Sequence, residues 1–466
     1  INNKKSITTL IQKDEKKKKK GIVWIFVVAT FAIFIKIVVV YSQEYIKEEK
    51  ENNYDLFLRQ LVQDFPMMGD NVKIIAQQTS DNNNNFIDVG VYAIRAIRKG
   101  TIILSSKSQL THTDPILDSL VERELQKYDY DSKPLTPQIV TSIFMVLEFE
   151  KGIESKYYSF FRTLPSHTTA GAWFWTPDEI ACTVPRHGLT AIDLQHTLQT
   201  FHKVITSLNK SYKPLQEYVA RNDDDASKLL EWAYLMVKTR AFDLGTLRPG
   251  LDKVNHNPTK GKSIFVTRNN NNTAYLVATQ DINVGDEIYT TYGKLYPTKM
   301  AEIYAFVDPD AAAYVNLPSV HHDLVDTDHT TNIKHCTNSE MLLYGNVTEQ
   351  YIEANLPGTT LRQAHHMKPY RPNRMLYECV RVLIQSENSQ DIASYLAQKI
   401  FEDYTKYKAM TENTKNNCQR NDGNFPLIRK ANNLTATLLY AAYEVAKKAE
   451  RGEIMDYPGV NYEFDE

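Results

Sequence analysis

Cysteine is scarce in this sequence. The chain of 466 residues holds four, namely Cys182, Cys336, Cys379 and Cys418. No two of them form a CxxC pair, and the histidine doublets at 321–322 and 365–366 lack the spacing of zinc ligands, so we expect no metal site. So few cysteines exclude a disulfide-built scaffold. Their even number fits disulfides, and it fits buried free thiols equally well.

A large excess of charge is also missing, because the formal net charge is −2. The distribution is uneven: residues 1–20 hold eight Lys against Asp14 and Glu15, a net charge of +6, which leaves −8 for the rest of the chain. An acidic remainder offers no basic stripe to a phosphate backbone, so we expect no nucleic-acid partner and disfavour a chromatin enzyme. The composition, 42% hydrophobic and 11% aromatic, is that of a globular protein with two or three domains.

Long hydrophobic runs are absent, with one exception. Residues 21–41 carry a single charge, Lys36, and this run is long enough to cross a bilayer as a helix. Five lysines at 16–20 precede the run and a mostly acidic segment follows it, so the positive-inside rule predicts a cytosolic N-terminus. We therefore expect a basic cytosolic tail over 1–20, a transmembrane anchor in the lipid bilayer over 21–41, and a charged linker over 42–53.

This topology predicts a single-pass membrane protein whose main domains are lumenal or extracellular. Two alternatives stay open. One is a cleaved signal peptide, although residues 38–41 lack the small side chains of a cleavage site. The other is an organelle membrane, since the sequence does not start with Met. If the topology is lumenal, four sequons become candidate glycosylation sites, at Asn209, Asn271, Asn346 and Asn433.

Hydrophobic periodicity beyond the linker predicts strands, then helices, then strands, then helices. The expected strands are two within residues 86–104, joined by a turn at 98–100, and three more at 263–267, 273–279 and 287–291. The expected helices are an inserted block at 138–150, 192–219 and 226–241, and a C-terminal block at 375–385, 390–410 and 427–451. The fold class is therefore α+β.

Five motifs follow one another along this part of the chain. They are residues 88–100, with Asp88, Val89 and Gly90 at their start; 156–165; 174–179; 252–256, with Asp252, Asn255 and His256; and 285–293, with Tyr292 near their end. In this order they resemble the SET-domain protein methyltransferases. The second and third are similar to the helical insert of the Rubisco large-subunit methyltransferase subgroup.

The resemblance covers about residues 55–308 and implies the following organisation. We expect a SET-type β-fold over 54–308 with a helical insert at about 135–238. A C-terminal helical domain over 309–466 would resemble the substrate-binding domain of the subgroup. The implied activity is methyl transfer from S-adenosylmethionine to a protein substrate.

The resemblance also implies roles for individual residues. Tyr292 would be the catalytic residue, with its hydroxyl at the methyl group and the amine. The implied cofactor-binding residues are Asp88, Val89, Gly90, Arg240, Asp252, Asn255, His256 and Tyr292, with Arg240 on the cofactor carboxylate. One departure is Asp88, which stands where relatives have the first glycine of Gly-x-Gly and adds a negative charge there.

Two aromatic residues bear on the substrate. Phe242 and Tyr304 would line the substrate channel, and an apolar ring beside the channel favours a lysine stem over a histidine. Histidine stays open as the alternative target. A function of another class also stays open: a catalytically silent, membrane-anchored SET-fold subunit that binds or scaffolds a partner, which Asp88 and the lumenal topology both favour.

Overall fold

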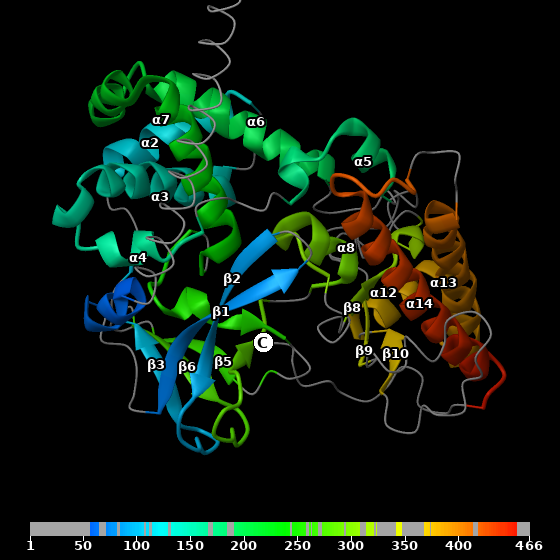
Figure 1. Ribbon diagram of the computed structural model, residues 1–466. Coiled ribbons are helices and arrows are strands. Elements are labelled where there is room, and N and C mark those ends of the chain that lie inside the picture. The colour runs from blue at the N-terminus through cyan, green and yellow to red at the C-terminus, as the bar shows by residue number, and fades with distance from the viewer. Residues whose placement is uncertain are drawn as a thin grey trace, which may run out of the picture. The chain divides into compact units, whose positions relative to one another are not determined.

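The computed structural model describes most of the chain beyond residue 55 (Figure 1). The described residues are 56–64, 71–81, 84–106, 109–110, 114–128, 132–165, 171–183, 191–242, 245–257, 261, 263–268, 273–292, 295–307, 314–320, 323, 342–346, 368–372, 374–412 and 418–453. The chain divides into two compact units, residues 1–60 and 61–466. All elements named below belong to the second unit.

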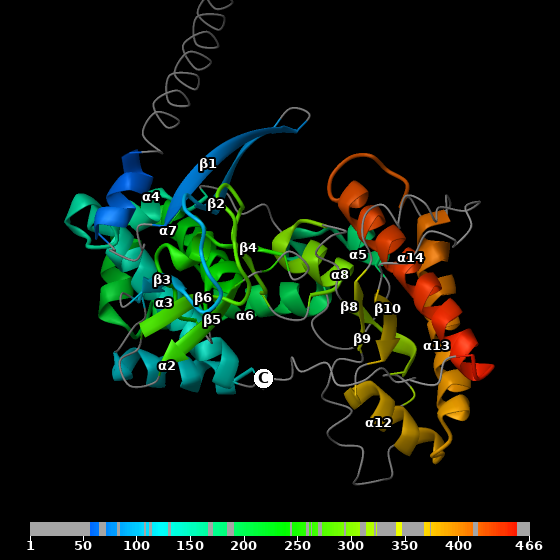
Figure 2. The ribbon, with the colours of Figure 1, turned by 90° about the horizontal axis from the view of Figure 1, so that it is seen from below.

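The first strands form an antiparallel ribbon. β1 (Val72–Asp81) and β2 (Asn84–Ala93) pair in register from Val72 opposite Ala93 to Asp81 opposite Asn84, and Figure 2 shows them running side by side. Successive side chains on a strand point to opposite faces, which is why Val91 and Ala93 are buried while Tyr92 between them is only half-buried. β2 thereby presents its backbone to the site described below. β1 lies outside the strands predicted from the sequence.

A three-stranded sheet supports the ribbon. Its order is β3-β6-β5, formed by β3 (Ile102–Ser106), β5 (Ser263–Arg268) and β6 (Thr273–Ala278), all antiparallel. The turn predicted at 98–100 is present, and Gly100 supplies its positive φ of 83°. The apolar sides of these strands share one core, in which Ile103, Leu104 and Leu276 are buried.

The inserted helices begin earlier in the chain than predicted. They are α2 (Pro115–Gln126), α3 (Ser132–Glu150), α4 (Tyr158–Arg162), α5 (Pro177–Ala181), α6 (Ala191–Leu208) and α7 (Lys213–Arg240). The single helix predicted over 192–219 is wrong in one respect: the chain leaves the helix after Leu208 and a new helix starts at Lys213. A proline in its first turn favours this start. α7 kinks at Asp223, whose φ is 43°.

The insert is followed by the short elements that carry the polar motifs. They are η3 (Leu251–Lys253), β4 (Asn255–His256), β7 (Tyr289–Thr290), α8 (Pro297–Lys299) and the π-helix η4 (Met300–Tyr304). η4 ends at Ala305, which has a left-handed φ of 56°. Such widened turns are frequent at functional sites. Tyr304 is the last residue of this turn.

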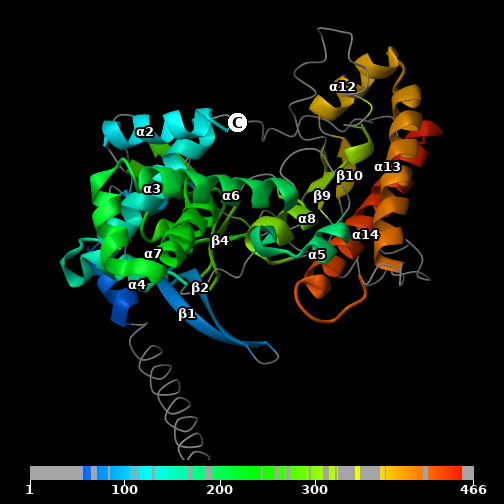
Figure 3. The ribbon, with the colours of Figure 1, turned by 90° about the horizontal axis from the view of Figure 1, so that it is seen from above.

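The sequence pattern predicted a C-terminal part made of helices alone, and this is wrong because the part also contains a sheet. A sheet of order β10-β9-β8 precedes the helices, formed by β8 (Tyr314–Asn316), β9 (Leu342–Asn346) and β10 (Lys368–Pro372). The helices α12 (Arg374–Ile384), α13 (Ser389–Glu412) and α14 (Phe425–Glu450) match the three predicted ones closely. α13 and α14 lie side by side (Figures 2 and 3) and bury apolar residues such as Leu396, Ile400 and Leu438.

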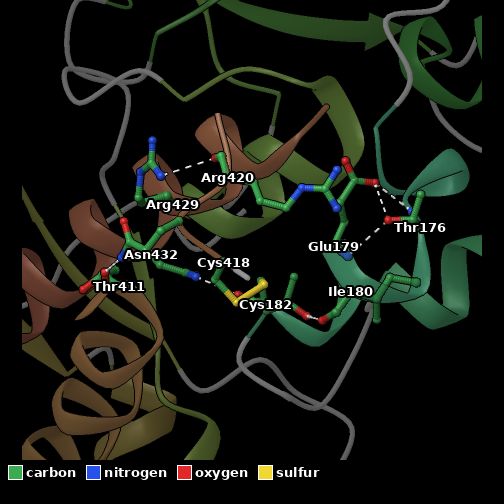
Figure 4. The surroundings of a disulfide bond; sticks show 11 residues. Thr176, Glu179, Ile180, Cys182, Thr411, Cys418, Arg420, Arg429 and Asn432 are labelled. Atoms are coloured by element: carbon green, nitrogen blue, oxygen red, sulfur yellow. Dashed lines mark hydrogen bonds between the residues drawn. A yellow bond between two sulfur atoms is a disulfide. The ribbon is translucent and has the colours of Figure 1, made fainter. Parts of the chain in front are cut away.

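A disulfide joins the insert to the C-terminal helices. Cys182 follows α5 and bonds to Cys418, with 5.6 Å between their Cα atoms (Figure 4). Beside it, the Glu179 carboxylate accepts from the N–H of Thr176 at 2.7 Å and from the N–H of Asn424 at 2.6 Å. One buried carboxylate thus caps the N-terminal ends of both α5 and α14. The sequence left open whether the cysteines form disulfides or remain free thiols, and Cys182 and Cys418 form a disulfide.

The predicted transmembrane anchor, residues 21–41, lies outside the described residues. Within the part that the structure describes, no helix has the length and apolarity needed to cross a membrane. The expected basic tail and linker also lie outside it.

Candidate active site

The two polar motifs meet because β4 and β7 pair in parallel. Asn255 lies opposite Tyr289, and His256 lies opposite Thr290. The N–H of Asn257 continues the ladder by donating to the carbonyl of Thr290 at 3.0 Å. Segments that the sequence separates are therefore adjacent in the fold, and Tyr292 emerges from the end of this pair.

Tyr292 is fixed to His256 through its backbone. The N–H of Tyr292 donates to Nδ1 of His256 at 2.8 Å, and the two ring centroids are 5.2 Å apart. Because Nδ1 accepts this bond, the proton of the neutral imidazole is on Nε2. Burial lowers the pKa of His256 to about 4, so the ring is neutral at physiological pH.

The hydroxyl of Tyr292 is also fixed. It donates to the carbonyl of Val254 at 2.7 Å, so the oxygen can meet a further group only through its lone pairs. The Tyr292 ring contacts Tyr304 at a centroid distance of 5.5 Å, and Tyr304 contacts Phe306 at 6.1 Å. These three rings, Tyr292, Tyr304 and Phe306, form an aromatic wall. Burial raises the pKa of Tyr304 to about 12, which keeps its hydroxyl protonated.

Asn255 connects β4 to both β2 and the β7 motif. Its Nδ2 donates to the carbonyl of Val89 at 3.2 Å and to Oε1 of Glu287 at 2.9 Å. The other carboxylate oxygen of Glu287 accepts from the hydroxyls of Tyr289 at 2.7 Å and Tyr92 at 3.2 Å. Glu287 is therefore the centre of a polar network that joins β2, β4 and β7.

Gly90 has no room for a side chain. A Cβ built at this position would lie 2.6 Å from Oε1 of Glu287 and 2.9 Å from the ring of Tyr92. The packing of the protein itself therefore requires a glycine at position 90, because the carboxylate of Glu287 occupies the space where a side chain would lie. Val89 and Gly90 lie beside this network, and their predicted contact with the cofactor stays a prediction.

Asp252 is the buried centre of a second cluster. Its Oδ2 contacts Nζ of Lys253 at 2.9 Å and NH1 of Arg240 at 3.5 Å, and its Oδ1 accepts from the N–H of Gly250 at 3.1 Å. Lys253 also donates to the carbonyl of Thr163 at 3.1 Å. Burial lowers the pKa of Lys253 to about 8, and Asp252 opposes that shift by favouring the ammonium.

Two buried nitrogen atoms at these clusters have no hydrogen-bond partner among the described residues. They are Nε of Arg240 and Nε2 of His256. Both are donors, because a guanidinium only donates and the imidazole proton is on Nε2. Buried donors without partners are uncommon in proteins and indicate a place where another group binds.

Phe242 and Asp88 are the two remaining residues that the sequence predicted for the site. Phe242 lies against the core of the strands, and its ring meets that of Phe265 edge-on at 4.7 Å. Its placement beside the substrate channel stays a prediction. Asp88 pairs with Gln77 through the β1–β2 register, and its side chain is outside the described residues.

The sequence did not single out Glu287, Lys253 or Phe306. Glu287 had a signal, because it is a charged residue at the start of the predicted strand 287–291, which leads to Tyr292. The signal for Lys253 was weaker, since a lysine between Asp252 and Val254 is equally compatible with an exposed position. In the structure it is 2% exposed.

Comparison with protein families gives the fold its name. The sequence model of the SET domain matches residues 88–293. This part of the chain is a SET domain. Its limits include both polar motifs and the whole helical insert, whereas Tyr304 lies beyond its end. The expected SET-type α+β fold is thereby confirmed.

Several solved structures resemble the chain around its SET domain at low identity. One is the SET domain of LSMT bound to lysine and AdoHcy, 12% identical, with 87% of this chain and 94% of that chain covered and a TM-score of 0.47. Another is Rubisco LSMT bound to AdoMet, 14% identical, with coverage of 86% and 93% and a TM-score of 0.42. With TM-scores below 0.5, neither carries weight here. No curated protein matches the sequence.

Proposed function

We propose that this protein is an S-adenosylmethionine-dependent methyltransferase that acts on a lysine side chain of a protein substrate. The observation that carries the proposal is the fixation of Tyr292 within the SET domain. His256 holds its backbone at 2.8 Å, and the carbonyl of Val254 holds its hydroxyl at 2.7 Å. A side chain held at both ends has the preorganisation that an in-line transfer requires.

The chain's own groups fit the cofactor. S-adenosylmethionine would supply an electrophilic methyl group, an ammonium, a carboxylate and an adenine. Arg240, whose Nε has no partner among the described residues, suits the carboxylate. Asn255 and His256 offer an acceptor and a donor, respectively, to the amino-acid and adenine parts. Asp252 holds Arg240 in place through an ion pair at 3.5 Å.

The hydroxyl of Tyr292 accounts for the catalytic role. Its proton is bonded to the Val254 carbonyl, so two oxygen atoms 2.7 Å apart present lone pairs at one position. Oxygen lone pairs stabilise polarised C–H groups, which is the interaction that a transferring methyl group needs. Tyr292 would therefore orient the methyl and the amine.

The aromatic wall favours lysine as the target. A lysine amine attacks only when it is neutral, and an apolar environment lowers its pKa by disfavouring the ammonium. Tyr292, Tyr304 and Phe306 provide such an environment next to the hydroxyl. Tyr304 keeps its proton, so no negative charge arises there to favour the ammonium. Phe242 would add to the channel from the strand core.

Binding of S-adenosylmethionine to the full chain tests the proposal. Titration calorimetry on the folded protein should show one site, and a peptide library with lysine-centred and histidine-centred members should show transfer to lysine. A folded protein that binds no S-adenosylmethionine would overturn the enzyme assignment. Transfer to histidine alone would overturn the substrate assignment and leave the reaction class intact.

A second candidate is a catalytically silent SET-fold subunit that binds or scaffolds a partner. Asp88 favours it, because a carboxylate replaces the glycine that relatives have at this position. Replacing Asp88 with Gly separates the two candidates. If the wild-type protein is silent because of this charge, the variant should bind S-adenosylmethionine at least ~10-fold more tightly.

The membrane topology is part of the same proposal. Residues 21–41 would anchor the chain in the bilayer with the SET domain on the lumenal or extracellular side. The Cys182–Cys418 disulfide supports an oxidising compartment. Expression of the full chain in a eukaryotic host should give a species whose mobility shifts on glycosidase treatment, and an Asn346→Gln variant should lose one part of that shift. A chain with no shift would contradict the topology.

A further inference from the structure

Glu287 is a charged group that the reaction described above does not use. From the described residues, its two oxygen atoms accept three hydrogen bonds, all from neutral donors: the Tyr92 and Tyr289 hydroxyls on Oε2 and the Asn255 amide on Oε1. An ionised carboxylate has about four acceptor positions. One therefore remains, and it belongs to Oε1, the oxygen next to Gly90.

Among the described residues, no cation compensates the charge of Glu287. Within the part of the chain that the structure describes, neither Lys nor Arg forms an ion pair with it. Asp252, by contrast, pairs with both Arg240 and Lys253. A half-buried carboxylate with neutral donors only is favourably placed to receive a cationic ligand, because a positive group removes the cost of the uncompensated charge.

Glu287 also sets the orientation of Asn255. Both protons of the Nδ2 amide group are used, one on the carbonyl of Val89 and one on Glu287. The amide cannot turn over without placing its oxygen against these two acceptors. Its Oδ1 is therefore left as an acceptor, and among the described residues nothing donates to it. Oδ1 of Asn255 and Oε1 of Glu287 are thus two open acceptors in one hydrogen-bonded pair.

Gly90 preserves the space at this pair. A Cβ there would approach Oε1 of Glu287 to 2.6 Å and close off the remaining acceptor position. The tyrosine hydroxyls hold the carboxylate from the opposite oxygen, so the carboxylate keeps Oε1 turned toward Asn255 and the β2 backbone.

We propose that Glu287 is a further binding residue for the cofactor: its carboxylate supplies a negative charge to the α-ammonium group of the amino-acid part, beside the acceptor that Asn255 would offer there. This inference rests on the proposed function, because it names a contact within the same cofactor site. It assigns opposite charges of the zwitterion to opposite side chains: the ammonium to Glu287 and the carboxylate to Arg240.

The experiment compares two ligands on the full chain by titration calorimetry. S-adenosylhomocysteine carries the ammonium, and its deaminated analogue has hydrogen in place of the amino group while it keeps the carboxylate and the adenosine. Wild-type protein should bind S-adenosylhomocysteine about 10- to 100-fold more tightly, the range expected for a charge-assisted hydrogen-bonded contact. Equal affinity of the wild-type protein for both ligands would overturn the proposal without any variant.

Three variants then test whether Glu287 is the residue that distinguishes the two ligands. Glu287→Gln should reduce the affinity for S-adenosylhomocysteine by about 10-fold or more and leave that for the deaminated analogue within about 2-fold. Glu287→Asp, which keeps the charge, should retain most of the preference. The matched control is Asp281→Asn, which removes one negative charge from an exposed carboxylate of the same domain. Asp281 accepts a hydrogen bond from the backbone N–H of Lys99, and the variant should change neither affinity.

The outcomes separate this inference from the function on which it rests. If Glu287→Gln weakens both ligands equally, the residue has a structural role only and the ammonium assignment fails. If the folded wild-type protein binds neither ligand, the proposed function fails. If it binds both ligands and Glu287→Gln changes neither, the reaction class stands and the role of Glu287 is lost.

Discussion

The backbone N–H of Tyr292 donates a hydrogen bond to Nδ1 of His256 at 2.8 Å. This bond joins the ends of the two motifs and fixes three properties at once: the direction of the tyrosine, the tautomer of the imidazole and its neutral state. The site thus depends on a histidine that acts as an acceptor through Nδ1, while its Nε2–H has no partner among the described residues.

Tyr292→Phe should abolish methyl transfer and leave the affinity for S-adenosylmethionine within about 3-fold of wild type. The change removes the hydroxyl and its bond to Val254 but keeps the ring and the backbone bond to His256. We expect a loss of about 1 kcal/mol in unfolding free energy from the lost hydrogen bond. Single-turnover transfer and calorimetry measure the two effects separately. The matched control is Tyr395→Phe, which removes a half-buried hydroxyl bonded to Asp323 in the C-terminal part. Unchanged turnover in Tyr292→Phe would remove this residue from its role.

Gly90→Ala should disrupt the polar network around Glu287. The added Cβ would lie 2.6 Å from Oε1 of Glu287, so the carboxylate must move. We expect about 1–3 kcal/mol of destabilisation, measured by denaturant unfolding, and at least ~10-fold weaker cofactor binding. Gly100→Ala is the control: it strains a positive-φ turn but meets no atom within 4 Å, and binding should not change. Equal effects of the two substitutions on binding would contradict the steric account.

Acid should destabilise the folded protein through His256. Burial depresses its pKa from 6.5 to about 4, so between these values the unfolded chain binds more protons and stability falls as the pH falls. The contribution is fully present above pH 6.5 and amounts to about 3 kcal/mol. His256→Asn cannot titrate and keeps an acceptor for the Tyr292 N–H. The difference in unfolding free energy between wild type and variant should therefore shrink between pH 7 and pH 4. A difference that is independent of pH would refute the assignment.

The Cys182–Cys418 disulfide should stabilise the fold by about 3–5 kcal/mol, because it closes a loop of 236 positions. Replacing both cysteines with Ala and measuring the denaturation midpoint under non-reducing conditions tests this value. Asn432→Ala removes only the neighbouring bond to the Cys182 carbonyl, at 2.8 Å, and should cost about 1–2 kcal/mol. A double variant with an unchanged denaturation midpoint would show that the covalent link contributes nothing measurable.

Much of the site was predictable because its residues occupy short motifs in a fixed order. Asn255, His256 and Tyr292 were named from the sequence, and the structure brings them together through the β4–β7 pair. The central role of Glu287 was not predictable. It depends on which strand lies beside Asn255, and the parallel pairing of two-residue strands leaves no periodic signal in the sequence.

The long helices were predicted best and the short strands worst. α12, α13 and α14 repeat apolar residues over three or more turns, which gives a strong pattern. β8 has three residues, and a strand this short cannot show an alternation that differs from chance. The break between α6 and α7 was missed because apolar residues continue at helical spacing through Tyr212 and Leu215, on both sides of it.

The separation between Cys182 and Cys418 also has a consequence for biosynthesis. The second thiol is translated 236 residues after the first, and at ordinary elongation rates this delay is about 10 to 50 s. During that interval α5 has been made but α14, the helix that Glu179 caps, has not. For that interval Cys182 has no access to Cys418, so its thiol is open to pairing with another cysteine.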